Sequence, residues 1–156
     1  MRSCFELSNG VQMPKIGFGT YKSTDGSDEC VISQALEAGY RLLDTSAAYK
    51  NEEQVGKAMA RSGISRKEIF LTSKVWKTNL GYENTKKSFQ ESLERLQTDY
   101  LDLFLLHWPK PDPESADWKE LDRESWRALE ELYKVGKVRA IGVSNFLPHH
   151  LVNIQK

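Results

Sequence analysis

Four side chains of the sequence have the types needed to deliver a proton to a substrate: Asp44, Tyr49, Lys74 and His107. They supply a carboxylate, a phenol, an amine and an imidazole, which together form a proton-delivery set. Each residue also has an ordinary explanation, as a turn residue, a half-buried aromatic, a solvated lysine or a core histidine. A shared site is favoured because each lies at the end of a predicted strand or in the loop that follows it.

Reduction of a carbonyl is the chemistry that suits this set. The carbonyl oxygen needs a proton as hydride arrives, and an unperturbed tyrosine with a pKa of about 10 is a reluctant donor. A Lys74 ammonium about 4 Å from the Tyr49 phenol would favour phenolate by up to about 4 kcal/mol at an effective dielectric constant of about 20. Ionised Asp44 would keep Lys74 charged. His107 could orient the carbonyl or help the proton move, depending on its tautomer.

Hydrophobic periodicity predicts strands and helices that alternate along the chain. The predicted strands cover residues 15–20, 40–44, 69–74, 100–108 and 138–146. The predicted helices cover residues 28–38, 52–61, 85–96 and 124–137, and a fifth helix begins at residue 151. Ser27 can cap the first helix, which stops at Gly39. Asn51 and Gln54 form a capping-box pattern at the start of the second helix.

Two glycine motifs lie near the N-terminus. Asn9-Gly10 accepts the positive φ values of a two-residue type I′ turn, which predicts a short β-hairpin. Gly17-Phe18-Gly19 begins like a dinucleotide-binding fingerprint, but Lys22 stands at its third glycine position and no suitable acidic residue follows. We therefore interpret Gly17 and Gly19 as residues that let the first strand bend and end tightly.

The alternation of buried apolar strands with amphipathic helices predicts an α/β fold with a parallel sheet. An open doubly wound sheet and a (β/α)8 barrel share this pattern. Asp44, Lys74, His107 and Ser144-Asn145 follow successive strands, and a barrel collects such residues at one face, which favours the barrel. Residues 1–156 are expected to form a single partial barrel of about five βα units. The proline-rich segment 109–117 is expected to be a stiff βα loop at the mouth of the site.

Composition excludes several classes of function. The formal net charge is 0 and the pI is near 6.8, so no basic surface for nucleic acid or an anionic membrane is indicated. Cys4 and Cys30 have neither metal-ligand spacing nor the density of a disulfide framework, and no metal site is expected. The sequence shows no signal peptide and no run long enough to span a membrane, so a cytoplasmic location is expected.

Several segments carry a resemblance to one enzyme family across essentially the whole chain: GYRLLDTSAAYKNEEQVG, LTSKVW, LLHWP and VRAIGVSNF. They resemble the signatures of the aldo-keto reductases, and in particular a microbial branch of diketogluconate and glyoxal reductases. The resemblance implies an aldo-keto-reductase-type (β/α)8 barrel. It also implies that Asp44, Tyr49, Lys74 and His107 form a catalytic tetrad, with Tyr49 as proton donor and NADPH as hydride donor.

The same resemblance implies contacts to cofactor and substrate. Ser144 and Asn145 match residues that hold the nicotinamide carboxamide, and Thr20, Tyr21 and Asp44 match positions beside the nicotinamide ribose. The matches to the substrate pocket are Tyr21, Ala48, Trp76, His107 and Trp108. Aromatic rings in several mouth loops suit an apolar carbonyl pocket, although ordinary core packing also explains them.

The expected function is NADPH-dependent reduction of aldehydes and ketones, with a small carbonyl compound as substrate. A complete barrel typically has about 250 residues, so about three strands are expected to be absent. The resemblance implies that the absent part carries the segment that grips the adenosine 2′-phosphate. The alternative is a truncated, non-catalytic half-barrel that binds a cofactor or a partner. Unpaired edge strands would then favour self-association. An isomerase or lyase on the same fold is less favoured, because no phosphate-binding loop or metal cluster is present.

Overall fold

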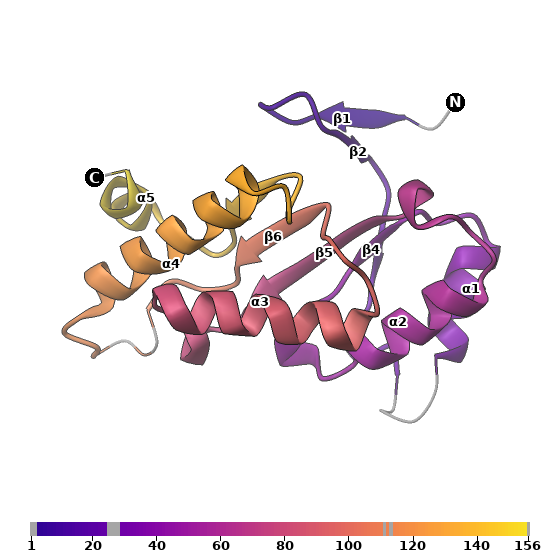
Figure 1. Cartoon of the computed structure of the whole chain (residues 1–156), viewed down its shortest axis with the longest axis horizontal. Helices are drawn as coiled ribbons and strands as arrows, with labels where there is room; N and C mark the ends of the chain where they lie inside the picture. Colours follow the sequence, from indigo (N-terminus) through magenta and orange to yellow (C-terminus); the bar gives the residue numbers. More distant parts are fainter. Residues whose placement is uncertain (1–2, 25–28, 111, 113, 156) are drawn as a thin grey trace.

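Five parallel strands form the centre of the computed structural model, which describes residues 3–24, 29–110, 112 and 114–155 (Figure 1). Their order in the sheet is β3-β4-β5-β6-β7, the same as their order in the sequence. The bounds are Phe18–Gly19 for β3, Leu42–Asp44 for β4, Phe70–Val75 for β5, Leu103–Leu106 for β6 and Ile141–Val143 for β7. Because all strands run in one direction, their C-terminal ends meet at one edge of the sheet.

The helices pack on the sheet and on their sequence neighbours. Their bounds are Cys30–Glu37 for α1, Glu52–Arg61 for α2, Tyr82–Leu96 for α3, Trp118–Lys134 for α4 and Pro148–Ile154 for α5. Contacts join α1 to α2, α2 to α3, α3 to α4 and α4 to α5, and Figure 1 shows α1 to α4 following one another around the sheet. This continuous row is the arrangement of a barrel's outer layer, whereas a doubly wound sheet has helices on both faces.

The hydrophobic core lies between this row of helices and the sheet. Leu43, Leu71 and Phe104 from the strands are fully buried, and the rings of Phe104 and Phe89 of α3 meet edge to face at 5.2 Å. Helix α2 crosses α3 so closely that a Cβ at Gly56 would lie 2.7 Å from a backbone oxygen of α3. Close packing of this kind fixes the strand ends that carry the polar residues.

A β-hairpin precedes the sheet, as predicted, with β1 at Cys4–Glu6 and β2 at Gln12–Pro14. The predicted two-residue type I′ turn is wrong. Leu7 and Val11 close a longer turn, in which Gly10 has a φ of 82° and Asn9 does not adopt a positive φ. A turn ending in a left-handed glycine needs only one such residue. Asn9 instead donates a hydrogen bond of 2.8 Å to the Arg139 carbonyl before β7, so the hairpin reaches across the sheet.

Other boundaries differ from the predictions in informative ways. Four of the five strands are shorter than expected, whereas β5 has the expected length, and of residues 15–20 only Phe18 and Gly19 pair with β4. Helix α4 begins at Trp118 rather than at residue 124, and α5 begins at Pro148, whose fixed φ suits the first turn of a helix. Helix α1 is followed by Gly39 with a φ of 100°, as predicted, whereas Ser27 lies outside the described residues.

The glycine and capping predictions near the site have mixed outcomes. A Cβ at Gly17 would lie 2.3 Å from the Leu42 side chain, so this glycine permits a close approach of β3 to β4. The capping box at the start of α2 is wrong, because the Asn51 side chain makes no capping hydrogen bond. It joins β3 to β4 instead, donating to the Thr20 carbonyl at 2.6 Å and accepting from the Thr45 hydroxyl at 3.1 Å.

Candidate active site

The four candidate site residues come together because three neighbouring strands end side by side. Asp44 is the last residue of β4, Lys74 lies in β5, and His107 immediately follows β6. Tyr49 is carried by a short 3-10 helix, Ala47–Tyr49, in the loop after β4. The Ser46 hydroxyl caps this helix by accepting a hydrogen bond from the Ala48 N–H at 3.2 Å.

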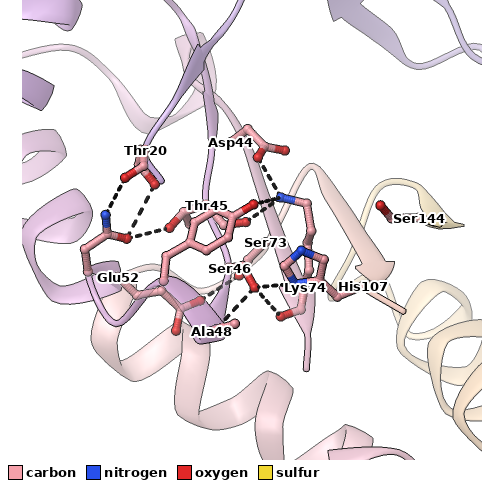
Figure 2. Close-up of polar contacts among 12 residues, drawn as sticks. Thr20, Asp44, Thr45, Ser46, Ala48, Glu52, Ser73, Lys74, His107 and Ser144 are labelled. Atoms are coloured by element: carbon pink, nitrogen blue, oxygen red, sulfur yellow. Dashed lines mark hydrogen bonds and ion pairs between the residues drawn. The ribbon is translucent and has the colours of Figure 1, made fainter. Parts of the chain in front are cut away.

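The Lys74 ammonium is the centre of the polar cluster (Figure 2). It donates to Asp44 Oδ1 at 2.6 Å, to the Thr45 carbonyl at 2.9 Å and to the Tyr49 hydroxyl at 3.5 Å. Lys74 is buried, with 6% of its surface exposed, so these contacts replace its lost hydration. An ammonium has three hydrogens, and three acceptors use all of them. Asp44 and Tyr49 are therefore linked through one cation.

His107 is buried beside this cluster, and its imidazole ring is hydrogen-bonded to Ser46. Its Nδ1 lies 2.8 Å from the Ser46 hydroxyl oxygen. Burial, and to a lesser extent the Lys74 charge, lower the pKa of His107 to about 4, while the Asp44 charge opposes the shift. Because the folded pKa is below the unfolded value of about 6.5, His107 is neutral near pH 7, and its contribution to stability is lost as the pH falls toward 4.

A cavity of about 1050 Å³ opens in front of Tyr49 and His107. Its walls include Tyr21, Ala48, Trp76 and Trp108. The Tyr21 and Tyr49 rings lie 5.0 Å apart, and the Trp76 and His107 rings meet edge to face at 5.1 Å. The phenol and the imidazole thus face a space with aromatic walls, which suits a small, partly apolar carbonyl compound.

The residues proposed to touch the cofactor lie around this cavity without lining it, except Tyr21. Thr20 is fully buried and its oxygens bond to Asn51. Ser144 and Asn145 follow β7, and the Asn145 amide donates to the His107 carbonyl at 2.8 Å and to the Ser144 hydroxyl at 3.0 Å. Asn145 borders a second cavity of about 800 Å³ that shares Trp76 and Trp108 with the first.

The sequence reasoning missed three supporting residues. Ser46 bonds His107, Asn51 joins two strand ends, and Glu52 is a fully buried carboxylate that accepts from Ser73 at 2.6 Å and pairs with Arg95 at 2.8 Å. The sequence predicted only a helix-capping role for Asn51. Nothing in sequence spacing indicated that Ser46 would reach a histidine 61 residues away.

The loop that carries Trp108 is tied to α4 by Asp122. Lys110 has a left-handed φ of 64° and donates its N–H to Asp122 Oδ1 at 3.1 Å. Asp122 is fully buried, and its Oδ2 has no hydrogen-bond partner. Burial raises the pKa of Asp122 to about 6, while the Lys110 N–H and charge oppose the shift.

Replacing Asp122 with Asn should remove a pH-dependent loss of stability. The folded pKa of Asp122 exceeds the unfolded value, so its contribution to stability is present below about pH 4 and is lost as the pH rises through about 6. Asn keeps an oxygen for Lys110 without the charge. We expect Asp122→Asn to be more stable than the parent at pH 8, by about 2 kcal/mol, and not at pH 4. Urea unfolding at both values measures this, and an equal difference at both would contradict it.

Two features are absent from the described part of the chain. None of its helices is long and apolar enough to cross a lipid bilayer. In the same residues, no three His, Cys, Asp or Glu side chains are grouped closely enough to hold a metal ion.

The parallel sheet, with its row of helices and a Lys–Tyr–Asp cluster at its C-terminal edge, has the form of a partial (β/α)8 barrel, and comparison with known proteins agrees. The family model for the aldo/keto reductase family matches residues 15–156. The chain belongs to the aldo-keto reductase family. The glyoxal reductase of Bacillus subtilis is 49% identical over 157 residues, which cover 100% of this chain and 54% of the relative. This match confirms the predicted resemblance to the glyoxal reductase branch.

Solved structures confirm the fold class. An aldo/keto reductase from Brucella melitensis superposes with a TM-score of 0.90 at 44% identity, covering 99% of this chain and 58% of that one. An aldo-keto reductase of Bombyx mori, solved in complex with NADP, gives a TM-score of 0.84 at 34% identity, covering 99% and 54%. This chain thus spans about half the length of its relatives, and its fold corresponds to about five units of the (β/α)8 barrel.

Proposed function

We propose that this chain carries the proton-handling part of an NADPH-dependent reductase of aldehydes and ketones. The observation that supports this most directly is the Lys74 ammonium held between Asp44 and the Tyr49 hydroxyl, at 2.6 and 3.5 Å. The cation lies beside the phenol oxygen, where negative charge develops as the phenolic proton leaves. Asp44 supplies the opposite charge next to the buried ammonium.

In this proposal, Tyr49 donates its proton to the carbonyl oxygen of the substrate. Its hydroxyl borders the aromatic cavity, and the Tyr21 and His107 rings, at 5.0 and 5.6 Å, hold the phenol ring in place. His107 is neutral near pH 7 and does not compete as an acid. A neutral imidazole with a hydrogen on its cavity side would donate a hydrogen bond to the same oxygen and orient it.

The donor set at the end of β7 fits a nicotinamide cofactor. A carboxamide needs one donor and one acceptor. The Ser144 hydroxyl can donate, and Asn145 Oδ1 stays available because the hydrogen bonds of this amide to His107 and Ser144 both use its nitrogen. Asp44, with 36% of its side chain exposed, and Tyr21 would border the ribose. The cofactor, when bound, supplies hydride to the carbonyl carbon.

Binding and turnover by the chain itself test the proposal. We expect NADPH, titrated against the 156-residue protein by fluorescence, to bind with a micromolar dissociation constant. With a small dicarbonyl such as glyoxal, chosen because of the glyoxal reductase relative, NADPH absorbance should fall. Millimolar or undetectable binding would reject catalysis by this chain, and binding without turnover would reject the proton-relay assignment.

A second candidate function is a non-catalytic half-barrel that binds a cofactor or a partner. It is favoured by the sheet edges, because in the described residues β3 pairs only with β4 and β7 only with β6. Ile16 beside β3 is 73% exposed. Unpaired edges and exposed apolar side chains favour self-association. Sedimentation would detect a dimer, and the NADPH titration separates this candidate from the reductase.

Replacing Lys74 with Met tests the role of the cation. Met keeps most of the volume of the buried side chain but removes the charge between Asp44 and Tyr49. We expect kcat for carbonyl reduction to fall about 100-fold, because the charge that develops on the phenol oxygen as its proton leaves loses the neighbouring cation. Lys77→Met, at a lysine that contacts Trp76 instead, is the matched control. An unchanged kcat in Lys74→Met would contradict the assignment.

A further inference from the structure

Ser46 is a buried side chain that touches two parts of the site at once. Its hydroxyl oxygen lies 2.8 Å from His107 Nδ1, 3.2 Å from the Ala48 N–H and 3.5 Å from the Lys74 carbonyl oxygen (Figure 2). None of its surface is exposed, so no solvent competes for these contacts. The hydroxyl therefore has a fixed set of partners, and the position of its single hydrogen can be deduced.

Counting hydrogens assigns the direction of the Ser46–His107 bond. A serine hydroxyl has one hydrogen and two lone pairs, and the Ala48 N–H already donates to one lone pair. The hydrogen can go to His107 Nδ1 at 2.8 Å or to the Lys74 carbonyl at 3.5 Å. A distance of 2.8 Å is typical of a strong O–H hydrogen bond, whereas 3.5 Å is at the outer limit. The arrangement that gives the Ser46 hydrogen its shorter contact has Ser46 donating to Nδ1.

This direction determines the tautomer of His107. An imidazole nitrogen that accepts a hydrogen bond has no hydrogen of its own, so the hydrogen of the neutral ring lies on Nε2. The ring is buried next to a lysine ammonium, which opposes a second proton. Nδ1 faces Ser46 and His107 lines the cavity, so Nε2 and its hydrogen are left for a substrate.

We propose that Ser46 is a positioning residue that holds His107 in the Nε2–H tautomer and keeps a hydrogen-bond donor available to the cavity. Ser46 also caps the 3-10 helix that ends at Tyr49. One hydroxyl therefore sets the orientation of the imidazole and the start of the turn that carries the phenol. The tautomer follows from geometry alone, whereas its use on a carbonyl oxygen rests on the proposed function.

Nitrogen NMR of the 15N-labelled chain tests the tautomer without any need for turnover. Two-bond 15N–1H correlations distinguish Nδ1–H from Nε2–H in each histidine, and His107→Gln assigns the His107 signals. We expect the parent to show only the Nε2–H form of His107 near neutral pH. In Ser46→Ala, which removes one oxygen, the Nδ1–H form should rise to a comparable population. An Nδ1–H parent, or an unchanged tautomer in Ser46→Ala, would overturn the proposal.

Ser73→Ala is the matched control, because Ser73 is an equally buried serine that bonds Glu52 rather than His107. It should leave the His107 signals unchanged, and an altered tautomer in Ser73→Ala would contradict a specific role for Ser46.

If Ser46→Ala does not fold, the parent spectrum still decides the tautomer. In the dicarbonyl assay, kcat/KM should fall about tenfold in Ser46→Ala, as for the loss of one hydrogen bond. A parent with the Nε2–H form but no turnover rejects the proposed function and leaves the tautomer assignment standing.

Discussion

Tyr49→Phe should lower kcat for carbonyl reduction by about 100- to 10,000-fold, the range contributed by a positioned general acid. The substitution removes one oxygen, the one that lies 3.5 Å from Lys74 Nζ. The phenyl ring keeps its contacts with Tyr21 and His107, so the cavity wall stays in place. A loss in kcat with little change in KM, measured by NADPH consumption, would assign the proton to Tyr49.

Tyr40→Phe is the control for this prediction. Tyr40 packs against Phe18, its hydroxyl has no part in the proposed relay, and the substitution removes the same atom. It should leave the rate unchanged. A Tyr49→Phe protein that reduced carbonyls as fast as the parent would overturn the assignment of the acid, and the water or side chain that then supplied the proton would have to be sought elsewhere in the cavity.

Asp102→Ala should destabilise the fold by about 3 kcal/mol, because two cations lose the buried carboxylate with which they form ion pairs. Asp102 is 1% exposed and pairs with Arg66 at 2.9 Å and Arg139 at 2.8 Å. It also accepts the Leu71 N–H at 3.0 Å. The expected loss is at the low end for a buried pair, since Arg66 and Arg139 are partly exposed and keep some hydration. Urea unfolding near pH 7 measures it.

Asp99→Ala is the matched control, because Asp99 is an exposed aspartate three residues away. A surface change of this kind should stay within about 0.5 kcal/mol. Equal unfolding free energies for the two variants would mean that the ion-pair cluster does not hold β5, β6 and the start of β7 together. The dicarbonyl assay below the unfolding range should show a much smaller effect for Asp102→Ala than for Tyr49→Phe.

The sequence determined the order of the βα units, because the strands are continuous apolar runs and the helices are amphipathic, and both patterns are local. It also indicated that Asp44, Lys74 and His107 would share one edge of the sheet, because parallel strands that are adjacent in the chain end side by side. The resemblance of the segment around Asp44 and Tyr49 to one family added the expected tetrad. Their catalytic roles stay predictions.

Only the tertiary structure decided the contacts between residues that are distant in sequence. Asn51 could be interpreted from its neighbours only as a helix cap, yet its amide joins the ends of β3 and β4, because those strands lie beside the start of α2. Ser46 shows no signal in the sequence, and its bond to His107 exists because the loops after β4 and β6 fold over the same strand, β5. Hydrogen bonds of this kind depend on packing rather than on local spacing, and so the candidate tetrad could be found in the sequence while its supporting residues could not.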